Sequence, residues 1–75
     1  MFKVGELYVY ESAIGLSGWT DKSMTEWSRL NLYKGDHFIV TEQTDQLAKI
    51  IATCNGKVFW VNRRYLSMRS RLIHE

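Results

Sequence analysis

Short apolar runs rich in aromatic and β-branched residues recur along this chain, separated by polar or glycine-containing segments. Runs of this kind are typical of β-strands, and they occur at residues 7–11, 37–42 and 67–73. Before the second run, Lys-Gly-Asp at residues 34–36 is typical of a turn. The pattern therefore predicts strands along most of the sequence, with tight turns between them.

Two further strands are expected at residues 47–54 and 57–61, on either side of Asn55 and Gly56. An Asn-Gly pair between two strand-like runs predicts a two-residue hairpin turn in which both residues adopt positive φ. Residues two apart in a strand share a face. One face of the first strand therefore carries Ala48, Ile50, Ala52 and Cys54.

A long polar stretch with two glycines, residues 12–23, interrupts the strand pattern. At its end Ser23 and Glu26 have the spacing of a capping box, and apolar residues then recur every three positions up to Leu30. The pattern predicts one or two helical turns over residues 24–29, with an irregular loop as the alternative.

Five short strands in 75 residues predict a mainly β fold, either a small barrel or a sandwich. The length suits a single domain spanning residues 1–75, with an insertion-like loop at about 11–29. A chain this short buries only a small core, so its stability is expected to be modest.

Three segments resemble the Src-homology-3 family of small β-barrels. Residues 6–10 are similar to its A-L-Y-D-Y strand, residues 30–40 to its diverging turn, and residues 61–66 to the segment before its last strand. Asn55 and Gly56 lie where that family has its distal hairpin. The resemblance implies a five-stranded barrel whose core contains Leu30, Leu32, Phe38, Val40, Ile50, Val61 and Leu66.

That family binds proline-rich peptides in a groove with an aromatic floor. Tyr8, Tyr10 and Tyr65 match positions of this floor. Leu47, however, stands near the position of its tryptophan, and Asn62 replaces its proline. The first loop is longer than usual and lacks the acidic cluster that reads basic residues beside the prolines. These departures indicate a ligand other than a proline-rich peptide.

Composition narrows the classes of protein further. A net charge of +2 is too small to indicate a nucleic-acid partner by itself, and one cysteine rules out an internal disulfide. The start of the chain lacks the apolar run of a signal peptide, and no segment approaches the roughly 20 apolar residues of a membrane span. These features predict a cytoplasmic protein.

Catalytic chemistry has little support in the sequence. Cys54 is expected to point inward as a structural residue. Asp36 and His37 are adjacent, so their side chains in a strand point to opposite faces, and Asp36 is expected to cap the turn. Without a phosphate-binding glycine loop or a cluster of metal-ligating residues, we expect no enzyme activity, no cofactor and no metal site.

We therefore expect a non-enzymatic binding module that modulates or inhibits a partner protein, in the way that small phage-encoded proteins bind host factors. Tryptophans in a loop either pack onto the fold or meet a partner, and tryptophan is enriched at interface hot spots. For Trp27 the favoured interpretation is that it packs with Met24 and Leu30. For Trp19 both interpretations remain open. The expected contact surface consists of Tyr8, Tyr10, Ile14, Leu16, Trp19 and Tyr65.

The alternative function is nucleic-acid binding by the basic C-terminal segment. Residues 57–75 carry five Lys or Arg side chains against one acid, Glu75. Aromatic rings beside arginines can stack on bases while the arginines contact phosphates. The residues of this alternative are Trp60, Arg63, Arg64, Arg69 and Arg71. An ordinary solvated face is the simpler interpretation, and self-association through an edge strand or exposed tryptophans is a third.

Overall fold

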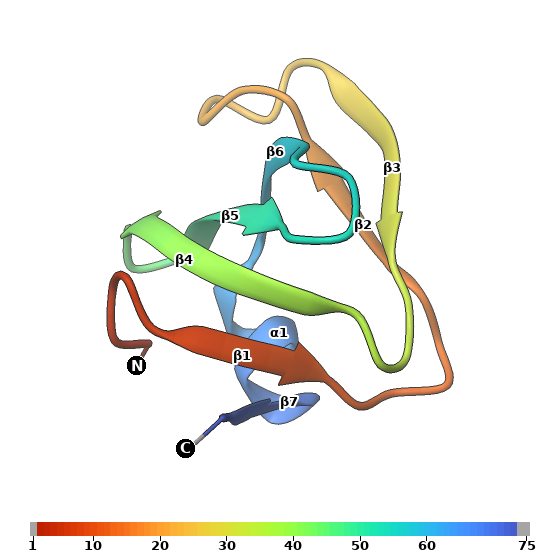
Figure 1. Cartoon of the computed structure of the whole chain (residues 1–75). Coiled ribbons are helices and arrows are strands. Elements are labelled where there is room, and N and C mark those ends of the chain that lie inside the picture. Colours follow the sequence, from red (N-terminus) through yellow and green to blue (C-terminus); the bar gives the residue numbers. More distant parts are fainter. Residues whose placement is uncertain (1, 74–75) are drawn as a thin grey trace.

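The computed structural model describes residues 2–73, apart from the side chains of residues 29 and 30. This part of the chain contains seven strands and one short helix (Figure 1). In chain order they are β1 (Leu7–Tyr10), β2 (Leu16–Trp19), β3 (Trp27–Leu32), β4 (His37–Gln43), β5 (Leu47–Ala52), β6 (Val58–Asn62), α1 (Arg63–Met68) and β7 (Ser70–Leu72). The predicted mainly β fold class is confirmed.

The strands form one antiparallel sheet in the order β3-β2-β6-β5-β4-β1-β7. β4, β5 and β6 form a meander at its centre, β1 and β7 extend it on one side, and β2 and β3 form a hairpin on the other (Figure 1). This hairpin occupies part of the segment predicted to be a loop with a short helix. The helix predicted over residues 24–29 is wrong, because β3 already begins at Trp27.

The core is filled from alternate strand positions, as a period of two requires. The expected core residues with described side chains are all fully buried: Leu32, Phe38, Val40, Ile50, Val61 and Leu66. Leu30, which was also expected there, lies outside the described side chains. Ala48 and Ala52 share the buried face of β5 with Ile50, as the alternation predicts.

Aromatic rings complete the core near the start of the chain. Phe2 packs edge-on against Tyr8 with ring centroids 4.9 Å apart, and Tyr8 stacks on Phe38 at 5.6 Å. Gln43 fixes the backbone of Phe2, since its Nε2 donates to Phe2 O at 2.7 Å and its Oε1 accepts from Phe2 N at 3.3 Å. The sequence pattern did not indicate that a residue before the first strand closes the core.

The turn predicted at residues 34–36, before β4, is confirmed. Gly35 has φ +92°, and its N–H donates to Tyr10 O at 2.7 Å, which ties the turn to β1. Asp36 caps the turn as expected, because its Oδ2 accepts from the Tyr33 N–H at 2.8 Å.

The β5–β6 connection differs from the predicted turn. Gly56 has φ +70°, but Asn55 does not adopt positive φ. The prediction of a two-residue turn in which both residues have positive φ is therefore wrong. The connection is longer: the Gly56 N–H donates to Ala52 O at 2.8 Å, and β5 ends at Ala52. Cys54 consequently lies exposed in the turn, which corrects the expectation that it points inward.

The C-terminal segment begins as a helix. Residues 67–73 were expected to form one strand, but α1 extends through Met68 and β7 covers only Ser70–Leu72. β1 pairs with β4 along one edge and with β7 along its other edge. No helix in the described part of the chain is long and apolar enough to span a bilayer.

Candidate functional site

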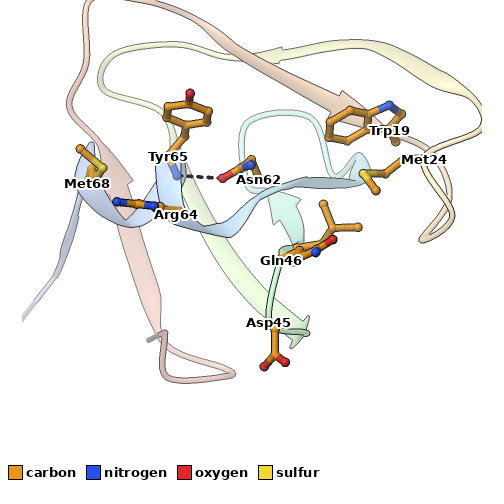
Figure 2. Close-up of a pocket in the computed structure, with 9 residues that line it drawn as sticks. Trp19, Met24, Asp45, Gln46, Asn62, Arg64, Tyr65 and Met68 are labelled. Carbon is orange, nitrogen blue, oxygen red and sulfur yellow. Dashed lines mark hydrogen bonds between the residues drawn. The ribbon is translucent and has the colours of Figure 1, made fainter.

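An open cavity of about 610 Å³ lies between the β2–β3 loop, the β4–β5 loop and α1, and we call it the loop–helix pocket (Figure 2). Its wall combines aromatic and methionine side chains with amide and charged groups. The lining residues are Trp19, Met24, Asp45, Gln46, Leu47, Asn62, Arg64, Tyr65 and Met68. A concave site with an apolar wall and a few polar groups is the usual form of a binding site.

Asp21 shapes the first wall of the pocket. Its Oδ1 accepts hydrogen bonds from the N–H groups of Thr25 and Glu26, both at 3.0 Å, and its Oδ2 accepts one from the Thr25 hydroxyl. These bonds, the Thr25 hydroxyl first, hold the pKa of the Asp21 carboxyl below its usual 3.8. The predicted capping box at Ser23 fails because Asp21, two residues earlier, takes these N–H groups. Met24 then has φ +59° and lines the pocket.

Asn62 shapes the second wall by starting α1. Its Oδ1 accepts from the Tyr65 N–H at 3.1 Å, which satisfies one of the N–H groups that lack a partner in a first helical turn. α1 buries Leu66 and leaves Tyr65 52% and Met68 70% exposed. Two large side chains therefore remain open to solvent beside the pocket.

Trp19 and Trp27 lie together at the base of the β2–β3 loop. Their rings meet edge-on with centroids 5.1 Å apart, and the two residues are paired across β2 and β3. Trp27 is 57% exposed, so the interpretation that it packs into the fold is wrong.

Gly18 lets β2 approach β6 closely, because a Cβ at that position would stand 1.8 Å from Trp60 O.

The structure brings together two of the residues expected to contact a partner, Trp19 and Tyr65, which both line the pocket. Ile14 is exposed but does not line it, and Leu16 packs against the core.

Tyr8 and Tyr10 do not belong to an exposed face. Both rings lie in the hydrophobic core, and the expectation that they form a contact surface is wrong for that reason. Their hydroxyls are used internally: the Tyr8 oxygen accepts from the Lys3 N–H at 2.7 Å, and the Tyr10 hydroxyl donates to Ile14 O at 2.6 Å. Aromatic rings at alternate positions of a short strand point to the same face, and in a domain this small that face packs into the core.

Several pocket residues were not singled out as contact residues from the sequence, namely Met24, Asp45, Gln46, Asn62 and Met68. The methionines carried a usable signal, because flexible thioether side chains at a surface suit adaptable contacts. That signal was hidden by the assignment of Met24 to a helix and of Met68 to a strand.

Three residues of the nucleic-acid alternative, Trp60, Arg69 and Arg71, have partners within the fold. Trp60 is buried, and the Lys22 and Lys49 ammonium groups each stand 5.9 Å from its ring centroid, so it offers no free stacking face. Arg71 pairs with Glu11 at 3.2 Å. The Arg69 guanidinium lies over the Tyr65 ring at 4.9 Å.

Arg63 and Arg64 follow the N-cap of α1, and the second of them lines the loop–helix pocket.

Within residues 2–73, no three side chains of His, Cys, Asp or Glu gather in a way that would hold a metal ion. No family model, curated protein or solved structure matches the chain.

Proposed function

We propose that this chain is a non-enzymatic binding module that modulates or inhibits a partner protein through the loop–helix pocket. One observation carries the proposal: two segments far apart in the sequence bring partly exposed aromatic and methionine side chains, Trp19, Tyr65 and Met68 among them, to one open cavity, and the β4–β5 loop forms its third wall. Aromatic anchors in a pocket are typical of interface hot spots. Methionine adds a surface that adapts to the shape of a partner.

We also propose a divergent relationship to the Src-homology-3-like barrels. The motif order along the sequence supports it, as does the pairing of β1 with both β4 and β7 around the β4–β5–β6 meander. The short helix before the last strand occupies the position of that family's helical turn. The buried Tyr8 and Tyr10 and the absent groove tryptophan argue for a partner other than a proline-rich peptide.

The proposal predicts that pocket variants lose a partner that surface variants keep. Tyr65→Ala removes an exposed ring from the pocket, and Tyr33→Ala removes a ring of similar exposure, 58% against 52%, that does not line it. We expect affinity capture from the native cell, read by quantitative mass spectrometry, to recover a protein with the wild type and with Tyr33→Ala. Its yield should fall at least about tenfold with Tyr65→Ala, as for a hot-spot truncation.

Circular dichroism of the three proteins provides the folding control, since neither tyrosine is part of the core. Equal recovery with Tyr65→Ala and wild type would overturn the pocket as the binding site. The nucleic-acid alternative is tested with the same proteins: single-stranded RNA or DNA that binds at low salt and dissociates steeply as salt rises would support it instead.

A further inference from the structure

Charge is unevenly distributed around the loop–helix pocket. Arg64 lines it from α1, and no acidic side chain in the described part of the chain pairs with its guanidinium. Arg69 adds a second cation at the same end, held over the Tyr65 ring at 4.9 Å. No acid occurs in α1 (Arg63–Met68) to offset these charges. The α1 end of the pocket is therefore positive.

The acidic lining residue is on another wall. Asp45 belongs to the β4–β5 loop and lies apart from Arg64 across the pocket (Figure 2). The two charges do not form an ion pair with one another in this arrangement. Each is left free to meet a charge of opposite sign on a bound molecule.

Besides the amides of Gln46 and Asn62, the wall has an apolar part. Trp19 and Leu47 contribute carbon surface from the sheet side, and Met24 contributes it from the loop. An apolar side chain of a ligand would gain by leaving water there, in proportion to the area it buries. The methionine can adjust its rotamer to the shape of that side chain.

We propose that the pocket binds a protein segment in which a large apolar residue has a carboxylate on one side, with the apolar side chain in the cavity and the carboxylate over α1 at Arg64, away from Asp45. This inference rests on the proposed function, since it names the partner chemistry of the same site. Guanidinium groups pair with carboxylates in two parallel hydrogen bonds, which gives geometric selectivity as well as attraction. The burial of Trp60 and the pairing of Arg71 with Glu11 favour such a segment over a nucleic acid.

Three short synthetic peptides test the inference. They share a central Leu-Trp pair and differ only in the residue on one side of that pair, which is Glu, Gln or Lys. Binding is followed by ¹H–¹⁵N chemical shifts of the full chain, with the Trp19 indole N–H and the Tyr65 amide as reporters of the pocket. At about 50 mM salt the Glu peptide should bind about tenfold more tightly than the Lys peptide, with the Gln peptide between them. At about 500 mM salt the difference should shrink, because these charges are solvent-accessible.

A pair of charge-reversal variants separates the local effect of Arg64 from that of net charge. Arg64→Glu should invert the order of the Glu and Lys peptides. Lys57→Glu changes the net charge by the same amount at an exposed turn residue outside the pocket, and it should leave the order unchanged. The chemical shifts also report whether each variant remains folded.

Two outcomes would overturn the inference. Equal affinities for the three peptides, with shifts at Trp19 and Tyr65, would remove the acidic preference and leave the proposed function standing. No shift with any peptide at millimolar concentration would also reject it, and the capture experiment with Tyr65→Ala would then decide separately whether the pocket binds a protein. If an oligonucleotide shifts the same reporters more strongly than the Glu peptide, the partner is a nucleic acid and the inference is wrong.

Discussion

At the scale of single residues, Gly18 governs how closely the β2–β3 hairpin approaches the rest of the sheet. A Cβ there would stand 1.8 Å from Trp60 O and 2.8 Å from Trp60 C, both of them backbone atoms of β6. Backbone atoms in the middle of a pleated sheet cannot swing aside as the end of a side chain can. The absence of a side chain at this position is therefore a structural requirement.

Gly18→Ala is expected to destabilise the protein by about 2–3 kcal/mol, the usual cost of overpacking a well-packed site. For a domain of this size such a loss lowers Tm by roughly 10–20 °C. Gly15→Ala is the matched control, since its added Cβ would meet the exposed Tyr33 ring at 3.2 Å and would lie at an ordinary contact distance, 3.6 Å, from Leu32 O. Thermal unfolding followed by circular dichroism measures both. Similar Tm values for the two variants would contradict the close approach of β2 and β6.

At the scale of elements, the β2–β3 loop depends on one carboxylate. The Asp21 side chain accepts from two backbone N–H groups and one hydroxyl within the next five residues. Its pKa is lowered in the folded state, so the ionised form is the one that holds the loop. The contribution of Asp21 is therefore complete above its usual pKa of 3.8 and is lost as pH falls through the lower folded value.

Acid titration should consequently release the loop before the sheet unfolds. The amide shifts of Thr25 and Glu26 are expected to move together below pH 3.8, while core amides such as that of Ile50 remain unchanged over the same range. In Asp21→Asn this low-pH transition should be absent, because the side chain no longer titrates. Asp45→Asn, which alters another loop carboxylate, should retain it. A transition that persists in Asp21→Asn would assign it to a different group.

The helix and strand assignments show where sequence patterns reach their limit. The period of two in β5 predicted its buried face correctly through Ala52. It failed at Cys54 because the turn began earlier than the Asn-Gly pair indicated. Residues 24–29 combine the apolar spacing of a helix with a capping signal. No helix forms there, because Asp21 accepts the N–H groups that a capping box would use and β3 pairs with β2. Local spacing does not show which polar side chain will capture a given N–H group.

At the scale of the whole molecule, the extent of 36 × 22 × 21 Å reflects a small core with the β2–β3 hairpin extending from it (Figure 1). The core is closed at one side by Phe2, whose ring contacts those of Tyr8 and Phe38. With so few buried side chains, each large ring contributes a sizeable share of a total stability of roughly 4–11 kcal/mol.

Phe2→Ala is expected to cost about 3 kcal/mol, at the lower end for a buried phenylalanine because the site lies at the edge of the core. Val4→Ala, which truncates a residue that is 57% exposed, should change the free energy of unfolding by less than about 0.5 kcal/mol. Urea denaturation followed by tryptophan fluorescence gives both values. An unchanged midpoint for Phe2→Ala would mean that the ring is not part of the core in solution.

The candidate site was less accessible to sequence analysis than the core. The resemblance to the Src-homology-3 family predicted the burial of Phe38, Val40 and Val61, and hydrophobic periodicity independently predicted that of Ile50. The pocket instead depends on which loops meet across the fold, and Trp19 and Tyr65 are 46 positions apart along the chain. Tyr8 and Tyr10 were misassigned because a tyrosine suits both a core and a binding surface, and composition cannot separate the two.

Two of the three walls of the loop–helix pocket come from residues 20–26 and 44–46, and none of the side chains in those segments is buried. Folding therefore places little constraint on their identity, apart from the positive φ of Met24 and the hydrogen bonds of Asp21 and of Thr44. The Thr44 Oγ1 accepts from the N–H groups of Gln46 and Leu47. We expect a library that randomises the remaining positions to yield variants that have similar Tm values but bind unrelated targets. On the proposed function, the molecule would be a compact scaffold with exchangeable loops.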